Sequence, residues 1–397
     1  MKGSIQKRVG KHGVSYRVRV DLGPDPITGE RRQRSETFST KKAAESALAK
    51  WLTEIEKGTA VDGTKMTLGE YLDYWLENYA RHNLRATTLR MYTNAIRLHI
   101  KPALGNIPLQ KLTAARLQSF YSERLRAGRT DGRGSQLAAK TVKDFHVILH
   151  KSLQQAVRWQ LVGRNVTDTV DPPHVSRAEM RIWDHETVRQ FLTYSEHDHY
   201  SPLWLVAIMT GLRRGELLGL KWDDIDLERG TLAVRRNLVE IGSTLYWQEP
   251  KTAKGRRVVD LPQVCIVALK AHRTKQLERR LQLGPAWQDT GLVFTTRRGN
   301  PITPRNMVRR FKRLIELAGV PEIRFHDLRH TSASLMLASG IHPKIVSERL
   351  GHSTISITLD VYSHVLPTMQ RDAADRLQAA LFPPDGQNED ETLPKCS

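Results

Sequence analysis

The sequence contains very little cysteine and no long apolar stretch, and both absences exclude classes of protein. Only 2 of its 397 residues are cysteines, Cys265 and Cys396, so it can form neither a disulfide framework nor a cysteine-rich zinc site. No run of about eighteen apolar residues occurs, which argues against a membrane span. The first residues, MKGSIQKRVGKHG, lack the apolar core of a signal peptide. We therefore expect a protein of the reducing cytoplasm that has no membrane as a partner.

Negative charge is also scarce relative to positive charge. The chain holds 62 Lys and Arg against 42 Asp and Glu, a formal net charge of +20, and its pI is about 10.1. The excess extends over three blocks: residues 1–58 (13 basic against 7 acidic), 66–165 (16 against 6) and 177–382 (31 against 22). A positive surface along the whole chain indicates a polyanionic partner, and we favour nucleic acid. A soluble basic protein without such a partner is the alternative.

Residues 1–58 show the pattern of a small sheet followed by a helix. The segment VSYRVRVDL alternates apolar and polar residues, which predicts a half-buried strand over 14–22. Two more strands are expected at 4–9 and 31–39, and Thr40 is a suitable cap for a helix after them. We expect the open face of this sheet to carry arginines that can enter a DNA groove, although an ordinary solvated face is the alternative. These candidate arginines are Arg17, Arg19, Arg31 and Arg34.

The second block, residues 66–165, has the periodicity of an all-α unit. Apolar residues recur at helical spacing in four segments, at 67–80, 87–100, 113–128 and 137–159. No motif in this block carries chemistry, so we interpret it as a binding module or a spacer. The preceding stretch, KGTAVDGTK, has glycine, threonine and lysine in the wrong order for a phosphate-binding loop, and we interpret residues 59–65 as a linker.

The third block, residues 177–382, contains the motifs that suggest chemistry. Helical patterns alternate with a short set of strands at about 231–261, and the polar, acidic tail at 383–397 is predicted to be disordered. The motif TGLRRGEL places Arg213 at the start of a helix, with Glu216 one turn later. Further along come HDLRH, then LGH, and then one tyrosine.

Together these side chains are sufficient for a transesterification at a phosphodiester. Two arginines can hold a phosphate through paired N–H donors, and histidine moves protons near neutral pH. Lysine can protonate a leaving oxygen, whereas tyrosine can attack phosphorus if a base helps it to ionise. The arginines and the lysine supply the positive charge that Mg²⁺ supplies elsewhere. We therefore expect no metal and no cofactor.

These motifs resemble those of the tyrosine recombinases, the phage-type integrases. The likeness extends over all three blocks and is most specific in the ordered series Arg…Lys…His-x-x-Arg…His…Tyr. The segment KPALGNIPLQKLTAARL is similar to the family's core-site DNA-binding domain, and the first block looks like its small arm-site-binding domain. The resemblance implies a multidomain fold: a small β-sheet plus helix at 1–58, an all-α core-binding domain at 66–165, and a mainly α (α+β) catalytic domain with a small antiparallel sheet at 177–382.

The resemblance also implies a role for each motif residue. Tyr362 would be the nucleophile, joined to DNA through a 3′-phosphotyrosine, while a pair of arginines would hold the scissile phosphate and a lysine would protonate the 5′-oxygen. One histidine would accept or relay the tyrosine proton, and another would donate a hydrogen bond to the phosphate. Glu216 would position its neighbouring arginine. Arg213 and Arg329 would hold the phosphate, and Lys251, or alternatively Lys254, would protonate the 5′-oxygen. His326 would take the tyrosine proton, and His352 would donate the hydrogen bond to the phosphate. His330 is interpreted as a structural residue.

Two metal sites are weaker alternatives in the same block. His326 and His330 have the spacing of a helical zinc pair, but Asp327 stands where such motifs have glutamate, and Arg329 would place a cation beside the metal. The acidic stretch around Asp224 suggests Mg²⁺, although a turn between a helix and a strand is the simpler interpretation.

The polar residues 197–199 are expected at the surface, and Trp222 is expected in the core. Trp204, Trp247 and Trp287 are expected in the core or in strands.

Recombination of two duplexes requires several active sites, so a homotetramer on double-stranded DNA is expected at core and arm sites. A host DNA-bending protein and an excision factor are possible further partners. Two other functions compete: a type IB-like DNA topoisomerase, and a DNA-binding regulator without catalytic activity.

The pattern at 368–382 predicts an amphipathic helix, whose apolar face packs either on its own domain or on a neighbouring protomer.

Overall fold

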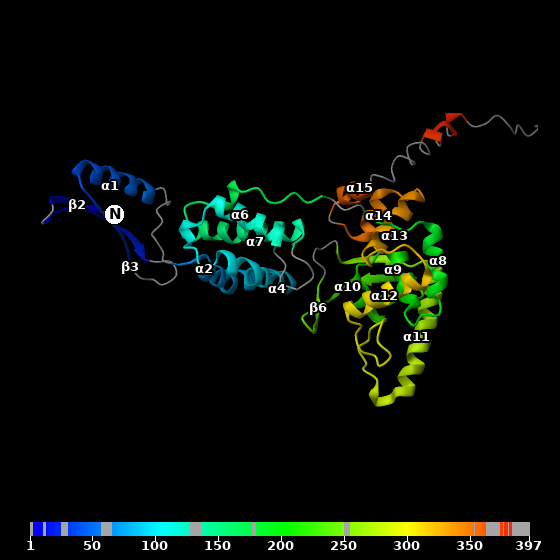
Figure 1. The fold of residues 1–397 in the computed structure, drawn as a ribbon. Coiled ribbons are helices and arrows are strands. Elements are labelled where there is room, and N and C mark those ends of the chain that lie inside the picture. Colours follow the sequence, from blue (N-terminus) through cyan, green and yellow to red (C-terminus); the bar gives the residue numbers. More distant parts are fainter. Residues whose placement is uncertain are drawn as a thin grey trace, which may run out of the picture. The chain divides into compact units, whose positions relative to one another are not determined.

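The computed structural model describes most of the chain and divides it into two compact units. The described residues are 3–10, 13–24, 31–56, 66–127, 136–176, 180–249, 255–352, 354–362, 374–375, 377–379 and 381–382. The first unit is Met1–Arg177, which holds a small sheet with one helix and then a helical region, and the second is Ala178–Ser397 (Figure 1). None of the helices in the described part of the chain is long and apolar enough to cross a membrane.

A three-stranded antiparallel sheet with one covering helix forms the start of the first unit. Its elements are β1 (Gly3–Gly10), β2 (Gly13–Pro24), β3 (Arg31–Phe38) and α1 (Lys41–Glu56), with the strand order β1-β2-β3. The side chains of Val18 and Val20 on β2 are buried against Ala44 and Trp51 of α1. This is the sheet and helix that the alternation in the first block predicts.

The open face of this sheet carries fewer of the predicted arginines than expected. Arg34 lies opposite Val20 in the strand register, and opposite residues point to the same side of a sheet. Its guanidinium carbon accordingly lies 4.3 Å from the centroid of the Trp51 ring, on the face that α1 covers. The expectation was wrong for Arg34 because residues an odd number of positions apart in a strand, such as Arg31 and Arg34, point to opposite faces.

Helices make up the rest of the first unit, as the second block predicts. The α-helices are α2 (Leu68–Trp75), α3 (Arg81–Asn83), α4 (Ala86–Ala95), α5 (Lys101–Leu104), α6 (Ala114–Ala127) and α7 (Ala139–Arg158). Wide π-helical turns, η1 (Leu76–Ala80) and η2 (Ile96–Ile100), join α2 to α3 and α4 to α5. Short 3-10 turns lie at η3 (Leu109–Lys111) and η4 (Val166–Thr169). The core contains Trp75, Phe120 and Phe145.

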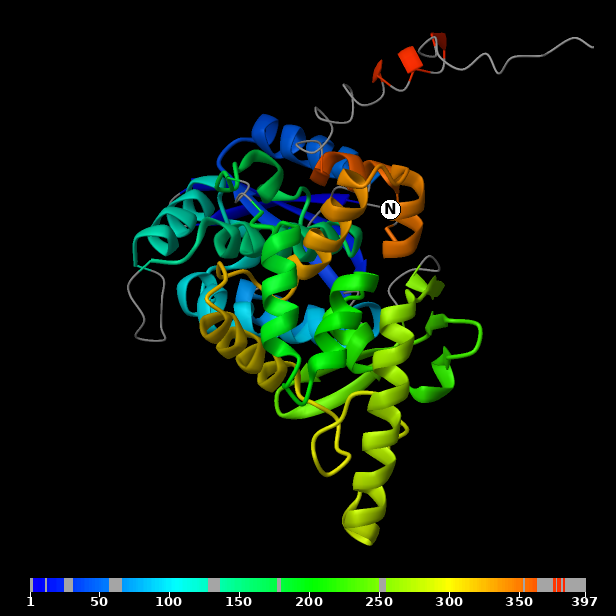
Figure 2. The ribbon, with the colours of Figure 1, turned by 90° about the vertical axis from the view of Figure 1, so that its right-hand side faces the viewer.

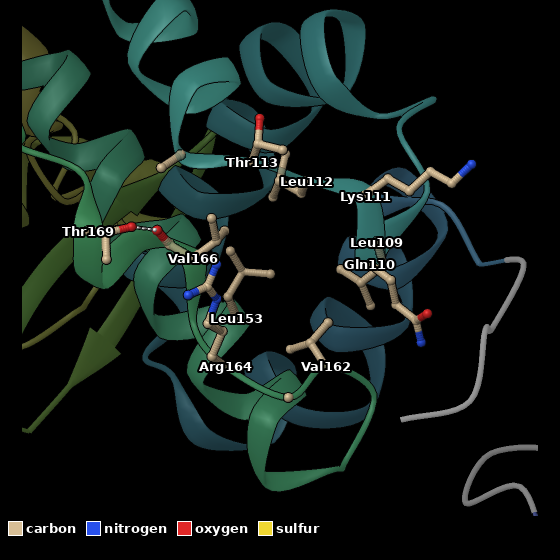
Figure 3. A pocket seen from close by; sticks show the side chains of 12 residues that line it. Leu109, Gln110, Lys111, Leu112, Thr113, Leu153, Val162, Arg164, Val166 and Thr169 are labelled. Atoms are coloured by element: carbon tan, nitrogen blue, oxygen red, sulfur yellow. Dashed lines mark hydrogen bonds between the residues drawn. The ribbon is translucent and has the colours of Figure 1, made fainter. Parts of the chain in front are cut away.

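A pocket of about 440 Å³ opens in this helical region, between η3, the start of α6 and the segment that follows α7. Figure 3 shows Leu153 and Val162 at the opening, whereas the side chain of Lys111 points away from it. Arg164 also lies at its edge. None of the motif residues of the third block lines this pocket.

The second unit is mainly helical and contains two small antiparallel sheets. Its helices are α8 (His185–Ser195), α9 (Ser201–Thr210), α10 (Arg214–Leu218), α11 (Gln263–Leu283), α12 (Pro304–Ala318), α13 (Asp327–Ala338), α14 (Pro343–Leu350) and α15 (Ile355–Tyr362). Short 3-10 turns are η5 (Trp222–Asp224) and η7 (Gly284–Ala286). The strands are β4 (Ile225–Asp226), β5 (Thr231–Val234), β6 (Asn237–Ile241), β7 (Thr244–Gln248) and β8 (Arg257–Asp260), ordered β4-β5-β8 and β6-β7. The predicted catalytic fold is confirmed, with two sheets in place of one.

Large aromatic residues fill the core of this unit and hold the motif helices in place. Trp183, Phe191, Trp204 and Phe311 are buried together, and helix α13 packs on α9. The helices α13, α14 and α15 lie at one end of the unit, and the last turns of α11 lie at the other (Figures 1 and 2). The segments that carry HDLRH and LGH, and the helix that ends at Tyr362, therefore lie at the same end of the unit.

Several smaller expectations are also settled in this unit. Asp198, expected at the surface, has a side chain that is only 2% exposed, because it pairs with Arg310 and accepts hydrogen bonds from the start of α9. Asp224 forms the predicted turn, since it accepts the Lys221 N–H at 2.9 Å. Trp222 is only partly buried, at the edge of the core. Trp204 lies in the core, and Trp247 lies in strand β7 with its ring exposed. Trp287 is partly buried and directly follows η7.

Candidate active site

The turn between α9 and α10 presents Arg213. Gly211 ends α9 with a left-handed backbone (φ 62°), and a Cβ atom at this position would collide with the Leu350 side chain. Arg213 then caps α10, and its backbone N–H donates to Glu216 Oε2 at 3.0 Å while Nη1 donates to Oε1 at 2.8 Å. The Arg213 side chain stays 40% exposed. The turn thus fixes the base of this guanidinium and leaves part of it accessible.

Arg329 enters the same place from α13 and is almost fully buried. Its Nη1 donates to the carbonyl oxygen of Gly211 at 2.8 Å, and its Nη2 donates to that of Leu350 at 2.7 Å. Two carbonyls on two different segments therefore set the plane of the guanidinium. A guanidinium fixed in this way does not have to lose side-chain freedom when a phosphate binds.

The C-terminal end of α14 is where the arginines meet. Three successive carbonyl oxygens accept hydrogen bonds from three arginines on different elements: that of Arg349 from Arg257 Nε (2.7 Å), that of Leu350 from Arg329 Nη2 (2.7 Å) and that of Gly351 from Arg213 Nη2 (3.3 Å). The last carbonyls of a helix have no partner within the helix and carry a partial negative charge. They are thus well suited to hold cations side by side. We call these three carbonyls and their arginines the α14 cluster.

Glu216 joins two of these arginines from the opposite side. Its side chain is 4% exposed and accepts from Arg257 Nη2 at 3.1 Å as well as from Arg213. Burial alone would raise the pKa of Glu216, but the charge and hydrogen bond of Arg257, followed by those of Arg213, hold that pKa below its usual value. The carboxylate therefore stays ionised between two guanidinium groups.

The histidines lie beside the α14 cluster and are held in the neutral form. Partial burial, followed by the charges of Arg329 and Arg213, lowers the pKa of His352 to about 4. His326 precedes α13 and is exposed, but the burial of part of its ring, followed by the charges of His330 and Arg329, lowers its pKa as well. A neutral imidazole has one nitrogen that accepts a proton and one that donates a hydrogen bond. These rings can therefore do both at neutral pH.

His352 is connected to the helix that ends at the candidate nucleophile. Its Nδ1 lies 2.8 Å from the hydroxyl oxygen of Thr358, a fully buried residue of α15. Tyr362 is the last residue of that helix, and its side chain lies outside the described part of the structure. Lys251 and Lys254 also lie outside the described residues.

The metal alternatives find no support in this geometry. No group of three or more His, Cys, Asp or Glu side chains that could hold a metal ion occurs within the described ranges. The rings of His326 and His330 are perpendicular, with centroids 5.2 Å apart. Asp327, which could have joined them, accepts hydrogen bonds from Arg324 instead.

The structure thus brings together Arg213, Glu216, His326, Arg329 and His352, as the motifs predict, and adds two residues. Arg257 and Thr358 were missed, because neither stands in one of the quoted recombinase motifs. A weak signal for Arg257 existed: in the alternation of β8, it shares an inward face with the buried Val259, which is an unusual place for a charge.

Such a cluster of fixed guanidinium groups and neutral imidazoles suits an enzyme that acts on a phosphodiester, and comparisons with known proteins agree. The profile described as "Phage integrase family" matches residues 182–369, "Phage integrase, N-terminal SAM-like domain" matches 67–125, and "Arm DNA-binding domain" matches 4–55. The XerC-like tyrosine recombinase of Caldanaerobacter subterraneus subsp. tengcongensis is 32% identical and covers 91% of this chain and 95% of its own. The ICEBs1 integrase of Bacillus subtilis is 27% identical over 92% of this chain and 97% of its own.

Solved structures share the fold at lower identity. An integrase fragment of the Tn1549 transposon in complex with transposon right-end DNA has a TM-score of 0.66 and 21% identity, over 79% of this chain and 100% of its own. A lambda integrase dimer bound to a COC′ core site has a TM-score of 0.55 and 17% identity, over 90% and 94%. The chain belongs to the phage integrase family and is a tyrosine-type site-specific DNA recombinase.

Proposed function

We propose that this recombinase cleaves and rejoins DNA strands through a 3′-phosphotyrosine intermediate, and that it integrates or excises a mobile element. The α14 cluster is the observation that carries the proposal. It holds Arg213 and Arg329 in fixed orientations next to two neutral histidines, and one of these is hydrogen-bonded to the helix that ends at Tyr362. Electrostatic stabilisation by groups that are oriented in advance is the largest contribution such a site can make to the rate.

Each residue has a role in the proposed cleavage step. The Tyr362 oxygen attacks the scissile phosphorus while its proton passes to neutral His326. Arg213 offers the accessible guanidinium to the phosphate oxygens, Arg329 lies on the inner side of the same site, and His352 donates a hydrogen bond. The bond from phosphorus to the 5′-oxygen breaks, and Lys251, or Lys254, gives that oxygen a proton.

The rejoining step is the reverse of cleavage on a new strand. The 5′-hydroxyl of the partner duplex attacks the phosphotyrosine, the lysine takes up the hydroxyl proton, and His326 returns a proton to the tyrosine. One phosphoester bond forms for each that breaks. No external energy source is therefore needed in the proposed reaction, and neither a metal nor a cofactor is assigned a role in it.

Double-stranded DNA is the proposed partner of both segments of the first unit. Residues 66–165 would bind the core site next to the cleaved bond, and residues 1–58 would bind a separate arm site, connected by the linker at 59–65. Arg17, Arg19 and Arg31 remain the candidate arm contacts, since Arg34 stacks on Trp51. Lambda integrase is a dimer on its core site in the solved complex, and we propose that this chain assembles further, into a homotetramer on two duplexes. A host DNA-bending protein and an excision factor would be accessory partners.

The predicted helix at 368–382 is the proposed contact between protomers. Only residues 374–375, 377–379 and 381–382 of this stretch are described. Leu377, Leu381 and Phe382 are 60%, 62% and 74% exposed there. This exposure favours packing on a neighbouring protomer, because a helix docked on its own domain would bury these side chains.

Substitution of Tyr362 by phenylalanine tests the proposed function. The variant should bind core-site DNA with unchanged affinity and form no covalent complex on a nicked suicide substrate, as read on a denaturing gel. An adduct at wild-type yield would remove Tyr362 from the proposal. Relaxation of supercoiled DNA without paired sites would favour a topoisomerase, and the absence of any adduct from the wild-type chain would favour a regulator.

A further inference from the structure

We propose that Arg257 is a positioning residue of the cleavage reaction, which orients Arg213 through Glu216 and connects the start of β8 to the end of α14. The inference rests on the proposed function of the same site. It concerns a residue outside the ordered Arg…Lys…His-x-x-Arg…His…Tyr series, and it assigns that residue no contact with DNA.

Arg257 occupies the point where three segments of the site meet. Its Nε donates to the carbonyl of Arg349 at 2.7 Å, its Nη2 to Glu216 at 3.1 Å and its Nη1 to the carbonyl of Gly255 at 3.3 Å. These partners belong to the end of α14, to α10, and to the residue that directly follows 250–254, the stretch that contains Lys251 and Lys254. The side chain is 7% exposed and all three of its nitrogens are engaged. It is therefore a structural connection and cannot readily bind a phosphate itself.

The connection from Arg257 to the substrate passes through a single carboxylate. Glu216 holds the side chain of Arg213 with Oε1, and it accepts both the Arg213 backbone N–H and Arg257 with Oε2. The direction of the Arg213 guanidinium thus depends on Glu216, and the place of Glu216 depends on Arg257. A buried carboxylate that loses one of two cationic partners is left with incomplete compensation for its burial.

Loss of Arg257 should therefore change the pH dependence of cleavage. The charged groups that face Glu216 are Arg213 from its own turn and Arg257 from β8. Of these, Arg257 contributes more to the lowered pKa of Glu216, against a burial effect that raises it. Without Arg257, Glu216 should take up a proton as the pH falls towards mildly acidic values. The neutral carboxyl would no longer hold Arg213, and cleavage would fall on the acidic side of the profile.

A second arginine–carboxylate pair in the same unit, with a buried carboxylate, provides a matched control. Arg236 pairs with Asp224, whose side chain is 1% exposed, at the connection between the two small sheets. The hydrogen bonds and ion pairs of Asp224 in the described structure join it to Arg236, Arg235 and Lys221, and none of these residues has a role in the proposed mechanism. Arg236→Met should thus show what the loss of such an arginine–carboxylate pair does to stability alone, without effect on the orientation of Arg213.

The test compares single-turnover cleavage of a core-site suicide substrate across pH for the full-length wild type, Arg257→Met, Arg257→Lys and Arg236→Met. Arg257→Met should cleave about tenfold to a hundredfold more slowly at neutral pH, and the loss should grow as the pH falls. Arg257→Lys should restore the wild-type pH profile but only part of the rate, because one ammonium group can pair with Glu216 but cannot reach three partners. Arg236→Met should keep the wild-type profile at temperatures where it is folded.

A double-mutant cycle with Glu216→Gln separates action through Glu216 from independent damage. If Arg257 acts through Glu216, adding Arg257→Met to Glu216→Gln should slow cleavage far less than it slows the wild type. Multiplicative effects, or an Arg257→Met variant with wild-type rate and profile, would overturn the inference while the proposed function stands. If Arg257→Met does not fold, the same cycle with Arg257→Lys decides. A wild-type chain that forms no adduct would overturn both.

Discussion

Arginine side chains have different environments in the sheet at the start of the first unit and in the α14 cluster of the second. On the sheet, Arg19 is exposed, and Arg31, with 74% of its side chain exposed, pairs with Asp21. In the α14 cluster, Arg329 is 4% exposed and both of its terminal nitrogens donate to carbonyl oxygens. The guanidinium of Arg329 is thus fixed by two buried carbonyl groups, whereas those of Arg19 and Arg31 lie at the surface.

This difference separates binding from chemistry. An exposed arginine can follow a phosphate backbone and adds affinity that depends on salt. A buried arginine has already lost its side-chain freedom during folding, so its full electrostatic effect is available when charge develops on the phosphate. Mutations in the α14 cluster should therefore affect the rate of cleavage, and mutations on the sheet should affect only where the enzyme binds.

The largest effect is expected at Arg329. Arg329→Lys keeps the charge but cannot donate to both the Gly211 and the Leu350 carbonyls, so the cation loses its fixed orientation. Cleavage should fall about a thousandfold. The measurement is the rate of adduct formation on a suicide substrate, with gel-shift binding to the core site as the control. A variant that loses binding and cleavage in equal proportion would show that Arg329 serves affinity.

A smaller effect on normal DNA is expected from the lysine, together with a chemical rescue. Lys251→Ala should slow cleavage about a hundredfold and regain speed on a substrate with a 5′-bridging phosphorothiolate, since a thiolate leaves without a proton. Lys254→Ala is the matched control and should be fully active on both substrates. Rescue of Lys254→Ala, with Lys251→Ala active on normal DNA, would assign the role to Lys254.

The sequence predicts the motif residues of the candidate site better than it predicts the residues that hold them in place. Arg213, His326, Arg329 and His352 could be predicted because phosphoryl chemistry needs those side chains in recognisable motifs. The link between Arg257 and the Arg349 carbonyl joins positions 92 residues apart in the chain. The alternation of β8 indicates that Arg257 faces inward, but it does not identify Arg349 as the partner.

The fold also has features that the sequence predicted and features that it did not. Helical periodicity predicted the helices of the first unit but not the wide turns η1 and η2, since a π-turn keeps nearly the same apolar pattern. Asp198 was expected in solvent because its neighbours are polar. Its partner Arg310 lies 112 residues away in the chain, so the burial of the Asp198 carboxylate depends on tertiary packing that the sequence pattern does not contain.

Acid should destabilise the second unit through partly buried histidines. Burial lowers the pKa of His199 and of His352 to about 4 in the folded chain, whereas an exposed histidine titrates near 6.5. The unfolded chain therefore binds more protons between these values, so stability is complete above about pH 6.5 and declines as the pH falls towards 4. Urea unfolding at several pH values measures this. His352→Gln should reduce the slope, and an unchanged slope would argue against a neutral His352.

Deletion of residues 1–58 should have the smallest effect on chemistry. The shortened protein should cleave an isolated core site at the wild-type rate, because none of the described contacts of the α14 cluster comes from this segment. Integration between full attachment sites should weaken, because the proposed arm contacts at Arg17, Arg19 and Arg31 are lost. Equal integration by the full and shortened chains would show that the sheet does not serve arm binding.

The nature of the covalent link tests the central claim most directly. Wild-type protein is trapped on a suicide substrate, the adduct is digested with a protease and a nuclease, and the modified peptide is sequenced by mass spectrometry. We predict a single peptide that carries a 3′-linked nucleotide on Tyr362. A link to any other residue, or a link through a 5′-phosphate, would contradict the proposed mechanism.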